Sequence, residues 1–189
     1  MEITIFGKGN MGKAIGGNFE KAGQKVTYAG RDFKDPLGDV VVLAVPYGAV
    51  DSILSAYKEE LAGKVLVDIT NPVNFDTFDG LVVPGDSSAA AEIQTKVPKA
   101  LVVKAFNTTF AGVLAAGSVG GKEPTVVLAA SDSEEAKKKL AEALEGSGLS
   151  VVDAGSLKRA REMEALGFLQ ISLAAREKIS WTGGFAVIH

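Results

Sequence analysis

The sequence predicts an α/β fold with one doubly wound, mostly parallel β-sheet. Short apolar runs alternate with helical segments along the whole chain, which is typical of strand-helix-strand units with right-handed crossovers. One run, residues 40–45, is continuously apolar, as expected of a parallel strand covered on both faces. The chain has 189 residues, of which 47% are hydrophobic, enough for one sizeable core but not for two full domains. We therefore expect residues 1–189 to form a single domain.

Glycine and capping residues set the boundaries of the elements predicted in the first half. Met11, Ile15 and Phe19 recur on one face of the first helix, which Gly23 closes. The predicted strands are residues 2–6, 25–29, 40–45 and 65–69. The predicted helices are residues 10–22, residues 49–61, and a helix capped by Ser87 or Ser88 that reaches about Val97. The segment between residues 73 and 85 has no clear period and is expected to be a loop.

The second half continues the alternation and ends in a long apolar helix. Strands are predicted at residues 101–105, 125–130 and 150–153, with a turn region at 117–124. Helices are predicted at residues 109–116, 133–145 and 157–178. The last helix is apolar on more than one face, so we expect it to be deeply buried or shared with a second subunit in a homodimer. Residues 155–189 are predicted to be a small C-terminal extension with a strand-like end.

Three glycines lie between the first strand and the first helix, in the spacing GxGxxG. At such a place the first glycine permits a tight turn, the second lets a pyrophosphate approach the backbone, and the third lets helix and strand pack closely. The N–H groups of the helix N-terminus then face the phosphates. An ordinary glycine turn is the alternative, which the flanking strand and helix disfavour. We predict a Rossmann-type dinucleotide site that uses Gly7, Lys8, Gly9, Asn10, Met11 and Gly12.

A basic residue follows the second strand. Arg31 comes nineteen positions after Gly12, where an NAD-specific site carries an acidic residue for the ribose hydroxyls. Arg31, together with Lys34, can pair with a 2′-phosphate, which favours NADP as the cofactor. Two alternatives remain: Asp32 could neutralise a solvated Arg31, or Asp32 could itself bind the ribose and select NAD.

The connection after Asp32 is unusually short. Residues 33–38 are too few for a helical crossover and a further strand, because such a crossover needs at least about 10–12 residues. We predict that the sheet is truncated after its second strand. The adenine pocket would then be open on one side.

Polar turns follow three of the predicted strands, and ligands of open parallel sheets bind beyond such carboxyl ends. Amides and hydroxyls in these turns can hold a carboxamide and a ribose, although Asn-Pro is also a common turn and Tyr47 could simply cap the core. The residues predicted to line this crevice for the cofactor are Val45, Pro46, Tyr47, Asn71 and Pro72.

Composition argues against several other functions. The net charge of −3 does not favour nucleic acid, and no stretch approaches the roughly 20 apolar residues of a membrane span. The chain has no cysteine and one histidine, His189, so neither a metal site nor a Ser-His triad is expected. The first residues show no signal-peptide pattern, and we expect a cytoplasmic protein without a membrane or nucleic-acid partner.

Three sets of charged residues have simple structural interpretations. Lys104 lies in an apolar strand, where a lysine more often extends to the sheet edge than forms a buried amine near a ligand. Arg161 and Glu164 have the i, i+3 spacing of a helical ion pair. The lysines at 137–139 are most simply a solvated helix face.

Taken together, the motifs resemble a known family. They are similar to motifs of the NADPH-dependent reductases of the F420:NADP oxidoreductase type and of the oxidoreductase domain of the STEAP metalloreductases. The segments that carry the resemblance are GKGNMG, AGRD, LAVPYGAV, LVDITNP, VVKAFNT and VVDAGSLKRAREMEALG, spread over nearly the whole chain. The resemblance implies a Rossmann-type domain whose C-terminal extension completes a second binding site.

The resemblance also implies hydride transfer between NADPH and a small acceptor, either a deazaflavin (coenzyme F420) or a flavin. Transfer between stacked rings depends on alignment more than on an acid or a base, so no catalytic side chain is predicted. By motif match, the residues that would face the second ring are Asn107, Thr108, Ala111, Gly183, Gly184 and Phe185. The alternatives are a non-catalytic NADP-binding or redox-sensing module, a reductase of another small acceptor and, less favoured, an imine or β-hydroxyacid dehydrogenase.

Overall fold

A seven-stranded sheet forms the centre of the computed structural model, which describes residues 1–188. Its strands have the order β2-β1-β3-β4-β5-β8-β9, and all neighbours are parallel except β5 and β8. The strands are β1 (Glu2–Phe6), β2 (Lys25–Ala29), β3 (Val40–Leu43), β4 (Val65–Asp68), β5 (Leu101–Ala105), β8 (Val126–Ala130) and β9 (Ser150–Gly155). His189, the last residue of the predicted tail, lies outside the described residues.

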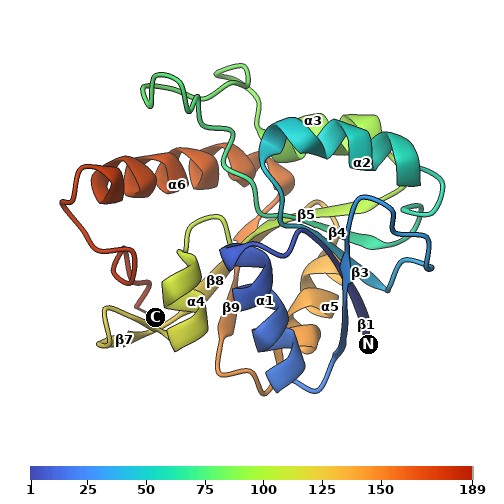
Figure 1. Cartoon of the computed structure of the whole chain (residues 1–189), viewed down its shortest axis with the longest axis horizontal. Coiled ribbons are helices and arrows are strands. Elements are labelled where there is room, and N and C mark those ends of the chain that lie inside the picture. The colour runs from blue at the N-terminus through green and yellow to red at the C-terminus, as the bar shows by residue number, and fades with distance from the viewer. Residues whose placement is uncertain (189) are drawn as a thin grey trace.

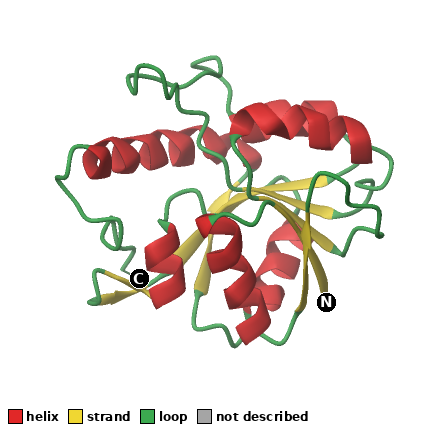
Figure 2. Cartoon of the chain, in the orientation of Figure 1, coloured by secondary structure: helices red, strands yellow, loops and turns green. Residues whose placement is uncertain are grey.

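Helices cover both faces of this sheet. Figure 1 shows α1, α4 and α5 on one side and α2, α3 and α6 on the other, and Figure 2 shows the strands as the layer between them. The helices are α1 (Asn10–Lys21), α2 (Val50–Tyr57), α3 (Ala89–Lys96), α4 (Ala111–Ala116), α5 (Glu134–Leu144) and α6 (Ala160–Ala175). The predicted doubly wound, mostly parallel α/β sheet is therefore confirmed.

The strands are buried on both faces because successive side chains of a strand point to opposite sides. In β3, Val40 and Val42 belong to the apolar cluster that contains Phe19 of α1, whereas Val41 belongs to the cluster that contains Leu54 of α2. Full burial of each such side chain contributes about 1.5–3 kcal/mol. The continuous apolar run predicted as a strand thus supplies both layers of the core.

The order of the strands creates a crevice beside β1. The chain leaves β1 through α1 and pairs β2 with one edge of β1, and it then crosses to the other edge, where Ile3 pairs with Val40 of β3. Open parallel sheets bind ligands where the strand order reverses, beyond the carboxyl ends of the strands. The glycine loop that follows β1 lies at this reversal.

The predicted truncation of the sheet is confirmed, since β2 is its edge strand. Residues 30–39 contain no helix or strand and lead back across the amino end of β1. There the N–H of Gly38 donates to Oγ1 of Thr4 at 2.9 Å. A side chain at Gly38 would collide with the carbonyl of Glu2, so this glycine permits the close crossing.

The long C-terminal helix is shorter than the predicted range 157–178. A 3-10 turn, Leu157–Arg159, precedes α6, which ends at Ala175. The cause of the early end is a left-handed cap: Glu177 has φ 56°, and the N–H of Lys178 donates to the carbonyl of Leu173 at 2.9 Å.

Other predicted boundaries also need correction. The helix expected at 49–61 begins as a 3-10 turn, Tyr47–Ala49, and ends at Tyr57. The turn region contains a hairpin of β6 (Ser118–Val119) and β7 (Glu123–Pro124). The strand expected at 150–153 extends to Gly155, and within residues 180–188 the structure has no strand.

The lysine run on α5 is not a wholly solvated face. The side chain of Lys137 is only 7% exposed, and its Nζ lies 2.7 Å from carboxylate oxygens of both Asp153 and Glu134. Hydrogen bonds to these carboxylates raise the pKa of Lys137, and the bond from Lys137 lowers the pKa of Asp153. Lys137 therefore ties α5 to β9.

Candidate functional site

The glycine loop has the steric character of a phosphate cradle. Gly7 has φ 103°, and a side chain there would collide with the carbonyl of Ala44. A side chain at Gly12 would collide with the carbonyl of Gly7, whereas nothing lies within 4 Å of a Cβ built at Gly9. Within residues 1–188 no side chain caps α1 at Gly9. Its first N–H groups are therefore available to an anion, beside an open stretch of backbone.

A first cleft of about 470 Å³ lies on one side of this loop. We call it the adenosine cleft because the sequence predicts the adenine pocket on this side, next to Arg31. Arg31 borders it, and among the described residues this guanidinium has no ion-pair partner. The hydroxyl of Tyr57 donates to the carbonyl of Phe33 at 2.6 Å, which attaches the short connection to α2. The lining residues are Phe6, Gly7, Ala29, Gly30, Arg31, Val45, Ala49, Ser52, Ile53, Ala56 and Tyr57.

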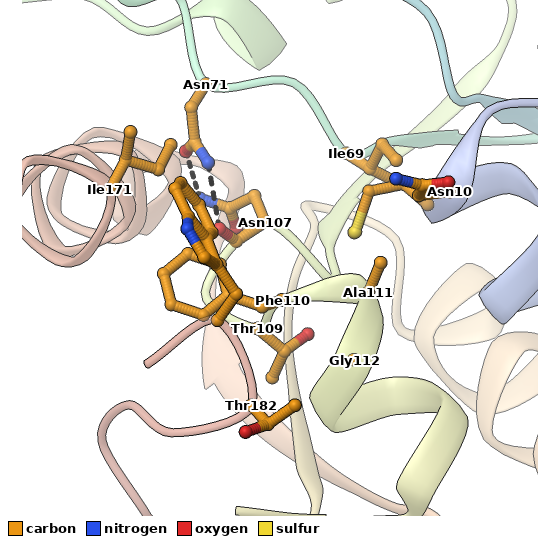
Figure 3. Close-up of a pocket in the computed structure, with 12 residues that line it drawn as sticks. Asn10, Ile69, Asn71, Asn107, Thr109, Phe110, Ala111, Gly112, Ile171 and Thr182 are labelled. Atoms are coloured by element: carbon orange, nitrogen blue, oxygen red, sulfur yellow. Dashed lines mark hydrogen bonds between the residues drawn. The ribbon is translucent and has the colours of Figure 1, made fainter. Parts of the chain in front are cut away.

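A second cleft of about 420 Å³, here called the acceptor cleft, lies beyond the ends of β4 and β5 (Figure 3). It lies between the N-terminus of α1, helix α4, helix α6 and the C-terminal tail. All of its lining residues are uncharged: Asn10, Met11, Ile69, Asn71, Asn107, Thr109, Phe110, Ala111, Gly112, Ile171, Trp181 and Thr182. Such a cleft is suited to a flat, uncharged ring.

A reciprocal pair of asparagines forms one wall of the acceptor cleft (Figure 3). Asn71 Nδ2 donates to the carbonyl of Asn107 at 2.9 Å, and Asn107 Nδ2 donates to Asn71 Oδ1 at 2.8 Å. Asn107 Nδ2 also donates to the carbonyl of Met163 in α6 at 2.9 Å. Helix α6 can lie against this pair because Gly167 has no side chain; a Cβ there would collide with Asn71 Oδ1.

The C-terminal tail forms another wall. The ring of Trp181 lies 4.9 Å from that of Phe110, centroid to centroid. Gln170 of α6 holds the tail in place: its Nε2 donates to the carbonyl of Thr108 at 2.8 Å, and its Oε1 accepts from the N–H of Phe185 at 2.9 Å. A side chain at Gly184 would collide with Gln170 Oε1.

Lys104 does not extend to the sheet edge, and Glu164 does not pair with Arg161. Instead Lys104 Nζ is buried 2.8 Å from Asp68 Oδ2 and 2.7 Å from Glu164 Oε1, and it donates to the carbonyl of Thr70. For Lys104 the structure thus bears out burial, the alternative to a place at the sheet edge, and the Arg161–Glu164 pair expected from spacing was wrong. In both cases the reason is that α6 packs over the ends of β4 and β5. Burial raises the pKa of Glu164, against the opposing effect of the Lys104 ammonium.

The structure divides the predicted cofactor residues between the two clefts. Gly7, Arg31 and Val45 line the adenosine cleft, whereas Asn10, Met11 and Asn71 line the acceptor cleft. Those that line neither cleft are Lys8, Gly9, Gly12, Lys34, Pro46, Tyr47 and Pro72. Gly9 belongs to the loop between the clefts, Gly12 lies in the first turn of α1, and the exposed Lys34 lies three residues beyond Arg31.

Two of the residues predicted to face a second ring, Asn107 and Ala111, line the acceptor cleft. Thr108, Gly183, Gly184 and Phe185 line neither cleft. Within the C-terminal tail, which was expected to face a second ring, Trp181 and Thr182 line the cleft in place of Gly183–Phe185. The lone tryptophan, two residues before Gly183, was the usable signal for this part of the tail. Sequence reasoning missed Thr109, Phe110 and Ile171 as lining residues.

Comparisons with known proteins identify the family. The family model described as "NADP oxidoreductase coenzyme F420-dependent" matches residues 33–72. The F420-dependent NADP reductase of Methanocaldococcus jannaschii is 33% identical over 150 residues, which cover 77% of this chain and 66% of that protein. The chain belongs to the F420-dependent NADP oxidoreductase family.

Two further proteins are similar to this chain over most of its length. A crystal structure of an Arthrobacter sp. fb24 protein, assigned as an F420 dependent NADP-reductase, has a TM-score of 0.83 and 26% identity over 100% of both chains. Rat (Rattus norvegicus) metalloreductase STEAP3 is 29% identical over 183 residues, covering 87% of this chain and 36% of that protein. The chain thus spans just under two thirds of the archaeal reductase (66%) and about one third of the metalloreductase (36%).

Within residues 1–188, none of the helices combines the length and the apolar character needed to cross a membrane.

Proposed function

We propose that this family member binds NADPH along the carboxyl edge of the sheet and transfers its hydride to a flat ring of the deazaflavin (coenzyme F420) or flavin type. The observation that carries the proposal is the pair of clefts on either side of the glycine loop. One is bordered by Arg31, which has no ion-pair partner in the described part of the chain, and the other has an uncharged lining. Membership of an NADP oxidoreductase family supports both the cofactor and the class of reaction.

The residues fit a phosphorylated dinucleotide. The uncapped N-terminus of α1 and the open backbone at Gly9 would receive the pyrophosphate. Arg31 would hold the 2′-phosphate, because a guanidinium without a protein partner gains charge-assisted hydrogen bonds from a phosphate. Asn10 and Met11, which follow the loop, would then meet the nicotinamide end.

The chemical contribution of the protein would be alignment and exclusion of water. Bound NADPH supplies the hydride. Met11, Ile69 and Ile171 offer apolar walls, and the side-chain amides of Asn10 and Asn71 offer hydrogen bonds that orient a ring. Because the residues that line the acceptor cleft include no acid or base, the proton that the ring takes up together with the hydride would come from water.

The lysine required by an imine or β-hydroxyacid dehydrogenase is not available in the acceptor cleft. Lys104 is fully buried in its ion pairs and lines neither cleft. A general acid or base must come within hydrogen-bond reach of the reacting atoms. We therefore favour transfer between rings.

The test is to mix the protein with NADPH and either F420 or FMN and to follow the loss of nicotinamide absorbance. We expect turnover with at least one ring acceptor. Binding of NADPH without turnover of any acceptor would contradict the proposal and favour a redox-sensing module, and turnover of imines or β-hydroxyacids alone would favour the dehydrogenase.

Two variants make this test specific to the acceptor cleft. Ala111→Trp places a bulky ring in the cleft and is expected to abolish turnover while the protein still binds 2′,5′-ADP at the adenosine cleft. Ala116→Trp makes the same change at an exposed position at the end of α4 and is expected to leave turnover unchanged.

A further inference from the structure

The proposed reaction leaves one buried group of charges without a role. Lys104, Asp68 and Glu164 have side chains that are 0–1% exposed, and none of them lines either cleft. Burying charges is costly unless they are paired and hydrogen-bonded. A cluster of this kind beside the ends of β4 and β5 therefore calls for an explanation.

The cluster around the Lys104 ammonium joins four elements of the fold. Lys104 and Asp68 are register partners at the ends of β5 and β4, and Glu164 comes from α6. Glu164 also accepts hydrogen bonds from the N-terminus of α3: the N–H of Ala89 donates to Oε2 at 2.9 Å, and the N–H of Ala90 donates at 3.4 Å to Oε1, the oxygen that faces Lys104. The backbone N–H groups of α3 thus help to balance two carboxylates against one ammonium.

Directional contacts are what α6 needs, because its sequence is apolar on more than one face. Apolar packing is non-directional, so it alone leaves such a helix free to rotate or to slide along its axis. A short ion pair to Lys104, together with hydrogen bonds to the N-terminus of α3, holds the helix that carries Glu164 in one position. Glu164 supplies such a constraint near the start of α6, and it adds to the hydrogen bonds that α6 makes through the Met163 carbonyl and the Gln170 side chain.

The position of α6 in turn decides the shape of the acceptor cleft. By its helical spacing, Glu164 lies on the same face of α6 as Gly167, which packs on the Asn71–Asn107 pair, and as Ile171. Figure 3 shows Ile171 at the cleft beside this pair of asparagines. The carbonyl of Met163, one residue before Glu164, accepts a hydrogen bond from Asn107. Any shift of α6 therefore moves one wall of the cleft.

We propose that Glu164 and Lys104 are positioning residues for the acceptor: their ion pair, seated on the N-terminus of α3, sets the place of α6 and so the width of the acceptor cleft. This inference rests on the proposed function for its kinetic consequence. It predicts that loss of the pair impairs the acceptor half of the reaction and spares the adenosine cleft, which α6 does not line.

The test compares Glu164→Gln with Glu162→Gln, a matched control on the same helix whose carboxylate is about half exposed (46%). Glu164→Gln keeps the shape but removes the charge facing Lys104. We expect kcat/KM for the acceptor to fall about tenfold or more, since small misplacements of reacting groups cost up to a hundredfold. We expect the Kd of 2′,5′-ADP to change less than twofold in both variants.

A second readout does not depend on turnover. Trp181 is the sole tryptophan and lies on the wall of the acceptor cleft, so its fluorescence, with hydrogen exchange of α6, reports the cleft directly. Glu164→Gln should change the Trp181 fluorescence and the hydrogen exchange of α6, and Glu162→Gln should change neither of them. This result is expected even if the wild-type protein reduces no acceptor and the proposed function fails. The inference would be overturned if Glu164→Gln kept the Trp181 fluorescence and the α6 hydrogen exchange of the wild type. It would also be overturned if this variant lost affinity for 2′,5′-ADP by the same factor as it lost kcat/KM for the acceptor.

Glu164→Asp covers the case in which Glu164→Gln does not fold. It keeps the charge but is one methylene shorter, so we expect a partial change in Trp181 fluorescence and in acceptor KM, with 2′,5′-ADP binding retained. A wild-type cleft in this variant, together with wild-type kinetics, would contradict a distance-dependent constraint by the pair.

Discussion

The three glycines of the loop are present for different reasons. Gly7 and Gly12 are required by the protein itself, since a Cβ at either would collide with backbone carbonyls. Gly9 faces open space and meets no such obstacle. Its small size is explained by a ligand that approaches the backbone, which supports the proposed phosphate site.

Arg31→Ala should weaken the binding of NADPH much more than that of NADH. The substitution removes a charge-assisted contact with the 2′-phosphate worth about 1.5–3 kcal/mol, a loss of roughly ten- to a hundredfold in affinity. Titration of both cofactors by fluorescence or calorimetry measures the difference.

The control for this variant is Arg176→Ala, which removes the same charge at an exposed position beyond the end of α6. It should leave both affinities unchanged. Lys34→Ala tests whether the second predicted cation shares the role, and it should have a smaller effect than Arg31→Ala. Equal losses of NADPH and NADH in Arg31→Ala would contradict the phosphate role.

Helix α6 connects the sheet to both walls of the acceptor cleft. Along one face it carries Glu164 for Lys104, Gly167 for the asparagine pair, and Gln170 for the tail. The carbonyl of Met163 adds a hydrogen bond from Asn107. The helix is therefore the element through which changes outside the cleft would reach the acceptor.

Gly167→Ala should destabilise the protein. The added Cβ would collide with Asn71 Oδ1 and lie 2.8 Å from the carbonyl oxygen of Asn107. Overpacking of this kind costs about 1–3 kcal/mol. Urea unfolding followed by circular dichroism measures the change in the free energy of unfolding.

Gly17→Ala is the matched control, because Gly17 lies inside α1 and nothing is within 4 Å of its built Cβ. Alanine there should stabilise the protein by about 0.5–1 kcal/mol, since it removes the flexibility of glycine from a helix interior. If Gly167→Ala were as stable as Gly17→Ala, the close packing of α6 on the asparagine pair would be wrong.

The molecule as a whole exposes apolar side chains on the outer face of α6. Leu169 is 48% exposed, and its neighbour Phe168 is only partly buried. We expect this face to form a homodimer at micromolar concentration, measurable by light scattering after gel filtration. Leu169→Glu should yield folded monomers, because it places a charge in the apolar contact.

The control for the dimer is Ala116→Glu, an exposed change on α4, which lies on the other side of the sheet (Figure 1). It should leave the dimer intact. Wild-type protein that is monomeric under these conditions would contradict the expected dimer.

Most of the sheet could be predicted from the sequence, because strands and helices follow from local periodicity and from glycine caps. The short connection after Asp32 also predicted that the sheet has no strand beyond β2, because six residues are too few for a helical crossover and a further strand. The end of α6 could not be predicted in this way. It depends on Glu177, a residue without left-handed preference that adopts φ 56°.

The site shows the same division. The glycine spacing and Arg31 are local features, and they predicted a dinucleotide site beside the end of β1. Asn107 stood out because it follows the end of a predicted strand, and family resemblance assigned it, with Ala111, to a second ring; the structure places both residues at the acceptor cleft. Trp181 and Thr182 reach that cleft because a tail far along the chain folds back onto α4, where Gly112 makes room for it.

The sequence by itself determined the elements around the glycine loop and the truncation after the second strand, since these depend on neighbours in the chain. It also predicted a phosphorylated dinucleotide from Arg31, with NAD as the alternative through Asp32. Only the tertiary structure decided that Lys104 is buried against Glu164 and that an uncharged acceptor cleft lies beneath α6. Those features arise from residues about 60 apart that meet when α6 packs on the strand ends, and no local pattern records such a meeting.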